Sequence, residues 1–286
     1  MKKYRLNNGL EIPSIGLGTW LIDNDKVKGT VKDAINLGYR LIDTAQAYGN
    51  EVGIGEGIKE SGIARSELFI TSKIRAEYKD YDSAKKSIDE SLKNLNVDYI
   101  DLMLIHAPQP WEEFRISDNN YYKENKEVWR ALEDAYEEGK VKAIGVSNFH
   151  DYDLKNIMES ARIKPMVNQV LAHVGQIPFE IIEFCKENDI VVEAYSPIAH
   201  GEANRIKEVE DFSKKYNKSF SQICLKYDLN LGMVVLPKAN SISHLKENLD
   251  LDFEISDEDM KVLDNAKALD DYGKHDMFPV FKQSGK

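Results

Sequence analysis

Four polar side chains of different chemistry each lie at or shortly after the end of a short, mostly apolar run: Asp43, Tyr48, Lys73 and His106. Such runs are typical of β-strands. The carboxyl ends of neighbouring parallel strands converge on one patch, and barrel enzymes build their active sites there. A phenol beside an ammonium and a carboxylate could act as a proton donor to a carbonyl, with an imidazole nearby. We therefore expect these four residues to form one site.

The runs that precede these residues belong to a regular alternation of strand-like and helix-like segments. Strands are expected at residues 15–19, 40–43, 68–72, 100–105, 143–147, 166–169, 191–195 and 233–236. Helices are expected at residues 25–37, 50–60, 82–95, 125–138, 151–160, 179–187, 206–216 and 219–230, with an extra one at 256–269. Eight βα repeats without a linker predict an α/β fold, a (β/α)8 TIM barrel, formed by residues 1–286 as a single domain.

Both ends of the chain are expected to form segments outside the eight βα repeats. Residues 1–13 contain Asn8-Gly9, a pair that favours the positive φ angles of a hairpin turn, and so predict an N-terminal β-hairpin. Residues 270–286 form a C-terminal tail that carries Phe278 and Phe281. This tail either folds over the barrel opening as a substrate lid or frays, as chain ends commonly do.

A doubly wound open sheet is the rival fold, and its glycine fingerprint is incomplete here. Gly16 and Gly18 supply two of the three glycines after the first strand, without a ribose-binding acid about 20 residues later. The glycines at residues 53–57 are also off-pattern and favour close packing of a helix. A phosphate-binding barrel isomerase is disfavoured because no glycine-rich loop follows the seventh or eighth strand.

Composition narrows the class of protein. The net charge of −11 argues against a general nucleic-acid binder, which would neutralise phosphates with basic residues. Cys185 and Cys224 lack the spacing of a zinc site or a disulfide framework, so we expect core thiols in a reducing cytoplasm. The first residues lack a secretory signal, and no run approaches the ~20 apolar residues of a membrane span. We expect a monomeric cytoplasmic enzyme that acts on a small molecule and does not associate with membranes.

The residues around the four polar side chains resemble the signatures of the aldo-keto reductase family. Residues 38–51 are similar to the first signature almost residue for residue, residues 92–106 to the second and residues 235–238 to the third. The similarity runs from about residue 6 to residue 269 and points to bacterial members of the glyoxal reductase or 2,5-diketo-D-gluconate reductase type. The resemblance implies a barrel that binds NADPH (or NADP) without a Rossmann fold and reduces aldehydes or ketones.

The family's catalytic tetrad corresponds to Asp43, Tyr48, Lys73 and His106. A phenol has a pKa of about 10. Lys73 near the Tyr48 oxygen would lower this pKa, while Asp43 would keep the lysine charged. Tyr48 would then protonate the developing alkoxide as hydride arrives, and His106 would orient the carbonyl oxygen. No metal is required.

The resemblance also implies a cofactor site along the strand ends. Ser147, Asn148 and Gln169 would bind the nicotinamide carboxamide, and Tyr195 would stack on the nicotinamide ring. The pyrophosphate would lie along Ser196, Pro197 and Ile198, the 2′-phosphate near Lys238, and the adenine near Glu247 and Asn248.

Two positions near the expected 2′-phosphate depart from the family pattern. Ala239 stands where the family usually has Ser or Thr, and His244 stands where it usually has Arg. An arginine offers bidentate contacts to phosphate that a mostly neutral imidazole cannot offer. We therefore expect a modest preference for NADPH, with NADH possible as a cofactor.

The substrate pocket is expected to be lined by Trp20, Trp111 and Phe114, together with Tyr48 and His106. Ala107 departs from the Trp that the family usually has after the catalytic histidine, so the pocket wall is atypical. One alternative from a different class stays open. Some members of the superfamily serve ion channels, so the chain could be a cofactor-binding regulatory subunit with little turnover. Turnover of model aldehydes separates the two.

Overall fold

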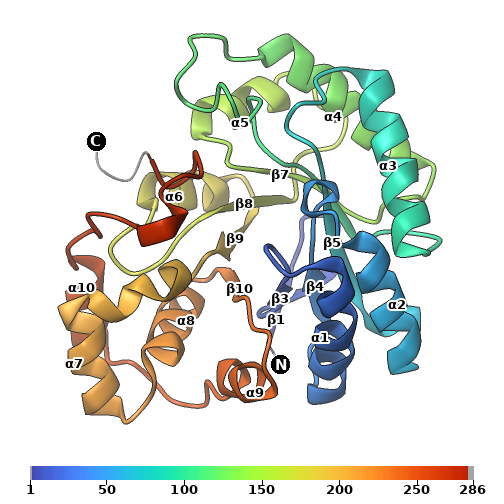
Figure 1. Cartoon of the computed structure of the whole chain (residues 1–286). Coiled ribbons are helices and arrows are strands. Elements are labelled where there is room, and N and C mark those ends of the chain that lie inside the picture. Colours follow the sequence, from blue (N-terminus) through green and yellow to red (C-terminus); the bar gives the residue numbers. More distant parts are fainter. Residues whose placement is uncertain (1, 283–286) are drawn as a thin grey trace.

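The computed structural model describes residues 2–282 and shows a ring of parallel strands surrounded by helices (Figure 1). Each strand pairs with the next one along the chain. Most strands lie within about two residues of their expected positions, so the predicted barrel is confirmed. The strands are β3 (Leu17–Gly18), β4 (Leu41–Asp43), β5 (Phe69–Ile74), β6 (Leu102–Ile105), β7 (Ile144–Ser147), β8 (Val167–Leu171), β9 (Val191–Tyr195) and β10 (Val234–Leu236).

The barrel closes where the first and last strands meet. Single parallel bridges join Ile15 to Val235 and Gly18 to Lys238. The N–H of Gly18 donates to the Pro237 carbonyl at 3.0 Å. A Cβ atom on Gly18 would lie 2.8 Å from the Leu236 carbonyl oxygen, closer than real side chains approach backbone. Gly18 therefore serves this close strand contact and not a phosphate loop, and the doubly wound alternative is wrong.

Ten α-helices lie within the described residues, and most agree with the expected ones. Helix α9 was not anticipated; it begins after Ser241, whose Oγ accepts a hydrogen bond from the His244 N–H. Helix α10 was expected to reach residue 269 but ends at Asp264. The helices are α1 (Asn24–Leu37), α2 (Glu51–Ser61), α3 (Tyr81–Leu95), α4 (Tyr122–Glu137), α5 (Asp151–Met158), α6 (Phe179–Glu187), α7 (Lys207–Tyr216), α8 (Phe220–Asn230), α9 (Ile242–Leu249) and α10 (Asp257–Asp264).

The glycine-rich start of α2 serves helix packing. A Cβ on Gly53 would lie 2.2 Å from the Asn24 carbonyl oxygen of α1, and one on Gly55 would lie 2.3 Å from the Leu95 carbonyl oxygen of α3. These glycines let α2 lie close to both neighbouring helices, as expected from the sequence.

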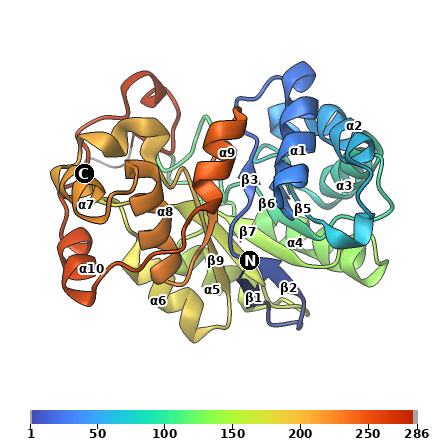
Figure 2. The same ribbon diagram turned by 90° about the horizontal axis from the view of Figure 1, so that it is seen from below.

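The N-terminal hairpin, β1 (Lys3–Arg5) with β2 (Glu11–Pro13), lies across one end of the barrel (Figure 2). Its turn is tied to segments that lead into strands. Asn7 Nδ2 donates to the carbonyls of Pro165 and Asp189, and Asn8 Nδ2 donates to that of Lys142. These carbonyls precede β8, β9 and β7, so the hairpin covers the amino end of the strands. The carboxyl end is left for a site.

The described part of the C-terminal tail packs against the barrel at its carboxyl end. Tyr272 is buried, and its hydroxyl is 2.8 Å from His173 Nε2, on the segment after β8. The rings of Phe278 and Trp20 meet edge to face, with centroids 4.6 Å apart. Phe281 is buried as well. The tail thus folds over the barrel through residue 282, and the rest of the expected lid, residues 283–286, lies outside the described residues.

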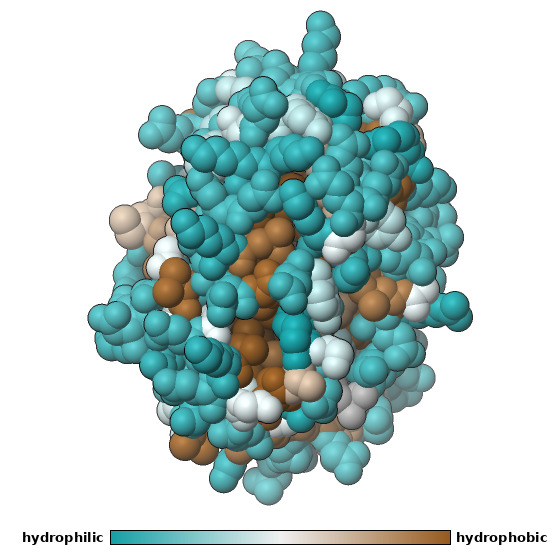
Figure 3. Space-filling view, turned by 90° about the vertical axis from the view of Figure 1, so that its right-hand side faces the viewer, coloured by the Kyte–Doolittle hydropathy of each residue, from teal (hydrophilic) through white to brown (hydrophobic). Residues whose placement is uncertain are grey.

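The face on the side of α2 and α3 is mostly hydrophilic, with hydrophobic side chains gathered in a narrow central furrow (Figure 3). The main apolar core instead lies in and around the barrel, where residues such as Leu41, Ile70 and Leu104 are inaccessible to solvent. Within residues 2–282, no helix is both long enough and apolar enough to span a membrane.

Candidate active site

Three neighbouring strands bring the four polar side chains together at the carboxyl end of the barrel. Asp43 is the last residue of β4, and Tyr48 ends the short helix η1 (Gln46–Tyr48) that follows it. His106 comes directly after β6. Lys73 was expected just beyond its strand but lies within β5, because β5 continues to Ile74 while pairing with β6. The lysine therefore emerges from inside the barrel wall.

The Lys73 ammonium is completely buried, and its three N–H groups are shared among four acceptor oxygens. Nζ donates to both carboxylate oxygens of Asp43, at 2.8 and 2.9 Å, and to the Thr44 carbonyl at 2.8 Å. It also donates to the Tyr48 hydroxyl oxygen at 3.5 Å. A phenol oxygen that accepts from an ammonium must direct its own proton elsewhere. The Tyr48 proton is thus available to the cavity in front of it.

The pKa of the Tyr48 phenol differs from the expectation. Burial raises this pKa above its usual value; the nearby Lys73 charge lowers it, but not enough to offset burial. For Lys73, burial disfavours the charge, but Asp43 and Tyr48 outweigh burial and raise the pKa of the ammonium. At neutral pH the pair is therefore a neutral phenol and a charged lysine, a proton donor beside a fixed positive charge.

His106 is held as a neutral imidazole. Burial, together with the charges of Lys73 and Arg75, lowers its pKa well below the usual value. Its ring centroid lies 5.7 Å from that of Tyr48 and 5.2 Å from that of Trp111. A neutral imidazole donates from one ring nitrogen, so His106 can hydrogen-bond an oxygen that also faces Tyr48.

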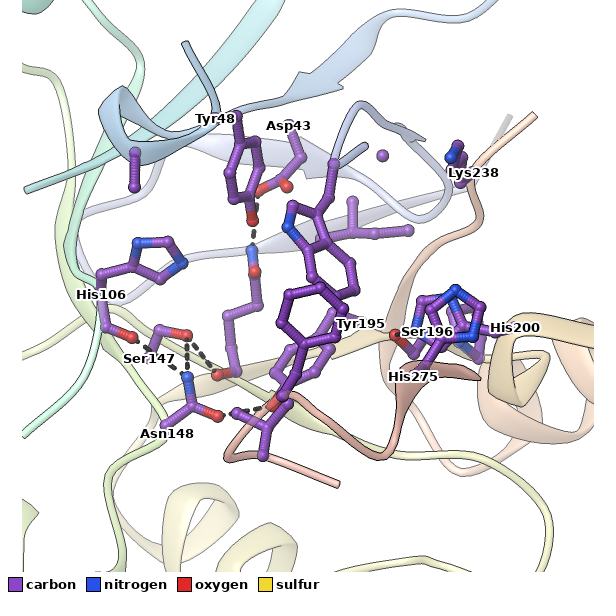
Figure 4. A pocket seen from close by; sticks show the side chains of 18 of the residues that line it. Asp43, Tyr48, His106, Ser147, Asn148, Tyr195, Ser196, His200, Lys238 and His275 are labelled. Atoms are coloured by element: carbon purple, nitrogen blue, oxygen red, sulfur yellow. Dashed lines mark hydrogen bonds between the residues drawn. The ribbon is translucent and has the colours of Figure 1, made fainter. Parts of the chain in front are cut away.

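A cavity of about 610 Å³ lies in front of these residues (Figure 4). Asp43, Tyr48 and His106 line it, whereas Lys73 stays behind them. Much of the remaining wall comes from the ends of β7, β8, β9 and β10 and from the tail. Lys238, which was expected near the 2′-phosphate, comes from the end of β10. The other strand-end side chains are those expected for nicotinamide and pyrophosphate: Ser147, Asn148, Gln169, Tyr195, Ser196, Pro197 and Ile198.

The comparison with known proteins places this barrel and its site in a family. Residues 14–268 match the Aldo/keto reductase family. The chain belongs to this family. The glyoxal reductase of Bacillus subtilis (strain 168) is 43% identical to this aldo/keto reductase over 262 residues, which cover 91% of each chain.

Solved structures of the family share the fold along nearly the whole chain. An aldo/keto reductase from Brucella melitensis is 38% identical with a TM-score of 0.85, over 92% of this chain and 98% of that one. A Bombyx mori aldo-keto reductase in complex with NADP is 30% identical with a TM-score of 0.83, over 92% of each chain.

The side chains at the base of the site of this aldo/keto reductase are joined by hydrogen bonds. Tyr195 Oη donates to Asn148 Oδ1 at 2.7 Å, and Asn148 Nδ2 donates to Ser147 Oγ at 3.0 Å. Gln169 Nε2 donates to Asp43 Oδ1 at 2.8 Å and to Glu193 Oε2 at 2.9 Å. Two carboxyl groups thereby fix the orientation of the Gln169 amide.

Sequence reasoning missed Glu193. It lies in β9, two residues before Tyr195, with no exposed surface. Burial and the Asp43 charge raise its pKa to about 8, although Gln169 and Lys73 oppose the shift. An acidic residue within an otherwise apolar strand was the available signal, because alternate residues of a barrel strand point inward.

Several expected cofactor residues lie outside the cavity lining. Ala239 and Asn248 are buried, whereas His244 is exposed near the start of α9. Glu247 lies on the same helix. These residues cluster around α9 beyond Lys238, so the described cavity covers only the nicotinamide and pyrophosphate end of the expected cofactor path.

Aromatic side chains line the expected substrate side. Trp20 and Trp111 both line the cavity, whereas Phe114 does not and instead packs behind Trp111 with ring centroids 5.3 Å apart. The small Ala107 side chain is fully buried in the same cluster. Trp111 thus stands beside His106 in the region where the family's usual Trp is missing.

The loop that carries Trp111 is braced by two residues that sequence reasoning missed. Gln109 Nε2 donates to the carbonyls of Ser117 and Asn119, and Gln109 Oε1 accepts from the Arg115 N–H. Arg115 also pairs with the buried Asp153, with Nη2 and Oδ2 2.8 Å apart. No sequence motif indicated these contacts, because they depend on the path of the loop.

Proposed function

We propose that this chain is an NADPH-dependent reductase of small aldehydes, in particular vicinal dicarbonyls such as glyoxal. One observation carries the proposal: the buried Lys73 ammonium donates to the Tyr48 oxygen, so the phenol proton faces the cavity that His106 also lines. A general acid, a fixed cation and a neutral hydrogen-bond donor around one point suit the reduction of a carbonyl.

Several side chains fit a nicotinamide at the base of the cavity. Gln169 Nε2 donates to Asp43 and Glu193, whereas Gln169 Oε1 accepts no hydrogen bond within residues 2–282. This oxygen and the Ser147–Asn148 pair would hold the carboxamide, and the Tyr195 ring would support the nicotinamide face. When bound, the reduced nicotinamide supplies the hydride.

The protein's own part in the reaction is to orient the carbonyl and supply a proton. His106 would donate a hydrogen bond to the carbonyl oxygen and hold it beside Tyr48. As negative charge develops on that oxygen, Tyr48 would transfer its proton, and the Lys73 ammonium, 3.5 Å from the Tyr48 oxygen, would stabilise the resulting phenolate. Asp43 keeps the lysine charged throughout.

NADPH is favoured as the cofactor on two grounds. The Bombyx mori relative is described as a complex with NADP. Lys238, after β10, lines the cavity and places a cation beyond the pyrophosphate end. The choice of small dicarbonyl substrates is supported by the similarity to a glyoxal reductase and by the aromatic wall of Trp20 and Trp111.

Steady-state assays with NADPH and NADH against a panel of aldehydes, dicarbonyls and keto-sugars test the proposal. Glyoxal and methylglyoxal should give the highest kcat/KM. A regulatory subunit would instead bind NADPH with very slow turnover of every compound. That result would refute the reductase proposal.

Tyr48→Phe should abolish reduction while cofactor binding stays nearly intact, because the change removes a proton donor and little volume. General-acid catalysis contributes about 10²–10⁴-fold, so kcat should fall by at least a hundredfold. The matched control is Tyr136→Phe on α4, whose hydroxyl makes no hydrogen bond within residues 2–282. Retention of more than about a tenth of wild-type turnover by Tyr48→Phe would contradict the assignment.

We also propose that the chain acts as a monomeric single domain in the cytoplasm. Both cysteines are buried free thiols, which suits a reducing compartment. Size-exclusion chromatography with light scattering should give a mass near 32.6 kDa, and thermal unfolding should proceed in one transition.

A further inference from the structure

Basic side chains gather on the side of the cavity opposite His106 (Figure 4). His200 lies in η3 (Ala199–Arg205) after β9, and Lys238 follows β10. Lys274 and His275 belong to η4 (Gly273–His275) in the C-terminal tail. All four line the same cavity as Tyr48. Segments that are distant in sequence thus bring basic groups to one wall.

The two histidines of this wall lie in contact, and burial keeps both imidazoles neutral at pH 7. The rings of His200 and His275 stack with centroids 3.9 Å apart, and His200 Nε2 is 3.2 Å from Ser196 Oγ. Burial, together with His275 and Lys238, lowers the pKa of His200 to about 3. Burial and Lys274 likewise lower the pKa of Lys238.

The carboxylates that act on this wall are already engaged. Asp23 pairs with Lys26 at 2.9 Å, and Glu202 pairs with Arg205 at 3.0 Å. Within residues 2–282, the Lys274 ammonium has no hydrogen bond or ion pair. In a chain with a net charge of −11, a cavity wall that gathers two lysines and two histidines, with the nearby carboxylates already paired, suits an anion.

The tail is held where Lys274 and His275 must face the cavity. Before them, Tyr272 is buried against His173. After them, Phe278 packs on Trp20 and Phe281 is buried. Anchors on both sides make η4 a fixed part of the wall.

We propose that η4 supplies phosphate ligands to the cofactor site: Lys274 and His275, with His200, bind the cofactor's pyrophosphate. The inference rests on the proposed function, which places the nicotinamide beside Tyr48. A dinucleotide carries its pyrophosphate one ribose away from the nicotinamide, and this basic wall adjoins the Ser196–Ile198 segment of the same cavity. The tail then closes over the cofactor as well as over the substrate.

Charge reversal at Lys274 tests the assignment. Dissociation constants for NADPH and NADH are measured by titration of protein fluorescence for the wild type, Lys274→Glu and the control Lys267→Glu. Lys267 is a matched control because it precedes the tail, its side chain is 82% exposed and its partner is Asp270. Lys274→Glu should raise both dissociation constants about tenfold or more, since it replaces a charge-assisted contact with repulsion. The control should change neither.

The two cofactors separate the possible outcomes. An equal increase in the dissociation constants for NADPH and NADH supports pyrophosphate binding by Lys274. Weaker binding of NADPH alone would indicate that Lys274 contacts the 2′-phosphate, which would overturn the assignment. Equal effects of Lys274→Glu and Lys267→Glu, or no effect of either, would overturn it as well. If the wild type binds NADPH and reduces aldehydes, and Lys274→Glu binds NADPH equally well, then the inference about η4 fails and the proposed function stands. If the wild type binds neither cofactor, the proposed function itself fails.

Discussion

Glu193 shows how one buried residue can influence both the catalytic group and the stability of the barrel. Its Oε2 accepts from Gln169, which also holds Asp43, while its Oε1 has no partner within the described residues. Because burial and Asp43 raise its pKa to about 8, the side chain keeps its proton at neutral pH. A second negative charge beside Asp43 would compete for Lys73, so the protonated form preserves the tetrad.

We expect Glu193→Gln to stabilise the protein increasingly as the pH rises from 5 to 8. The folded-state pKa lies above that of the unfolded chain, so unfolding releases a proton in this window. The wild type then loses about 1.4 kcal/mol of stability per pH unit from this group. Glutamine does not titrate and can still accept from Gln169. Denaturant unfolding at pH 5, 6.5 and 8 measures the gap, and a gap that stays constant with pH would contradict the raised pKa.

At the scale of elements, the loop between β6 and α4 determines where Trp111 stands. Arg115 holds this loop by donating to the Asn148 carbonyl at 2.9 Å and to Asp153. Asn148 itself lines the cavity, so one arginine joins the loop that carries Trp111 to the proposed nicotinamide end.

Arg115→Ala should therefore raise KM for glyoxal by roughly tenfold, while the dissociation constant for NADPH changes less. The physical reason is that breaking a buried pair leaves Asp153 without its cation and loosens the loop. Arg130→Ala on α4, which removes an exposed pair with Glu127, is the control. Equal losses in cofactor and substrate binding would contradict this prediction, because Arg115 would then support the Asn148 side as much as the loop that carries Trp111.

Helix α9 carries His244, which we expect to lie near the cofactor's 2′-phosphate. His244 is exposed near its start, with its N–H bonded to Ser241, so a longer side chain meets no packing restriction. We expect the wild type to prefer NADPH modestly, and His244→Arg to raise the NADPH:NADH ratio of kcat/KM about tenfold, since a charge-assisted hydrogen bond contributes roughly 1.5–3 kcal/mol. An unchanged ratio would place His244 away from the 2′-phosphate.

The sequence predicted the strands and most helices where the residue pattern lay within a single element. Apolar runs located all eight barrel strands, and residue types at their ends located Asp43, Tyr48 and His106. Helix α9 was missed because its eight residues give a short pattern, although Ser241 was a cap signal. Lys73 was placed beyond its strand because the end of β5 is set by pairing with β6. Glu193, Gln109 and Arg115 depend on contacts between distant segments, which periodicity does not encode.

At the scale of the whole molecule, the two chain ends close opposite ends of the barrel. The hairpin covers the amino end of the strands through Asn7 and Asn8, and the tail covers the carboxyl end through Tyr272. The anchor of the tail is a histidine. His173 Nδ1 donates to the Val174 carbonyl at 2.7 Å, so Nε2 accepts from the Tyr272 hydroxyl at 2.8 Å.

This anchor should make the molecule sensitive to acid. Burial lowers the pKa of His173 to about 4, below its value of about 6.5 in an unfolded chain. Between these values the unfolded chain binds a proton that the folded protein does not. The stability from this group is therefore complete above pH 6.5 and is lost, at about 1.4 kcal/mol per pH unit, as the pH falls to 4.

His173→Gln should reveal this contribution, because glutamine does not titrate and so removes the slope. The variant should be less stable than the wild type at pH 7, where it loses the fitted imidazole, and the difference should narrow as the pH falls to 4.5. Unfolding free energies from denaturant titrations at several pH values measure it. His244→Gln, at an exposed histidine, is the control and should change the free energy of unfolding little. If the His173→Gln difference instead stays constant with pH, then burial does not keep the folded His173 imidazole neutral, and the hydrogen bond to Tyr272 does not hold the tail as described.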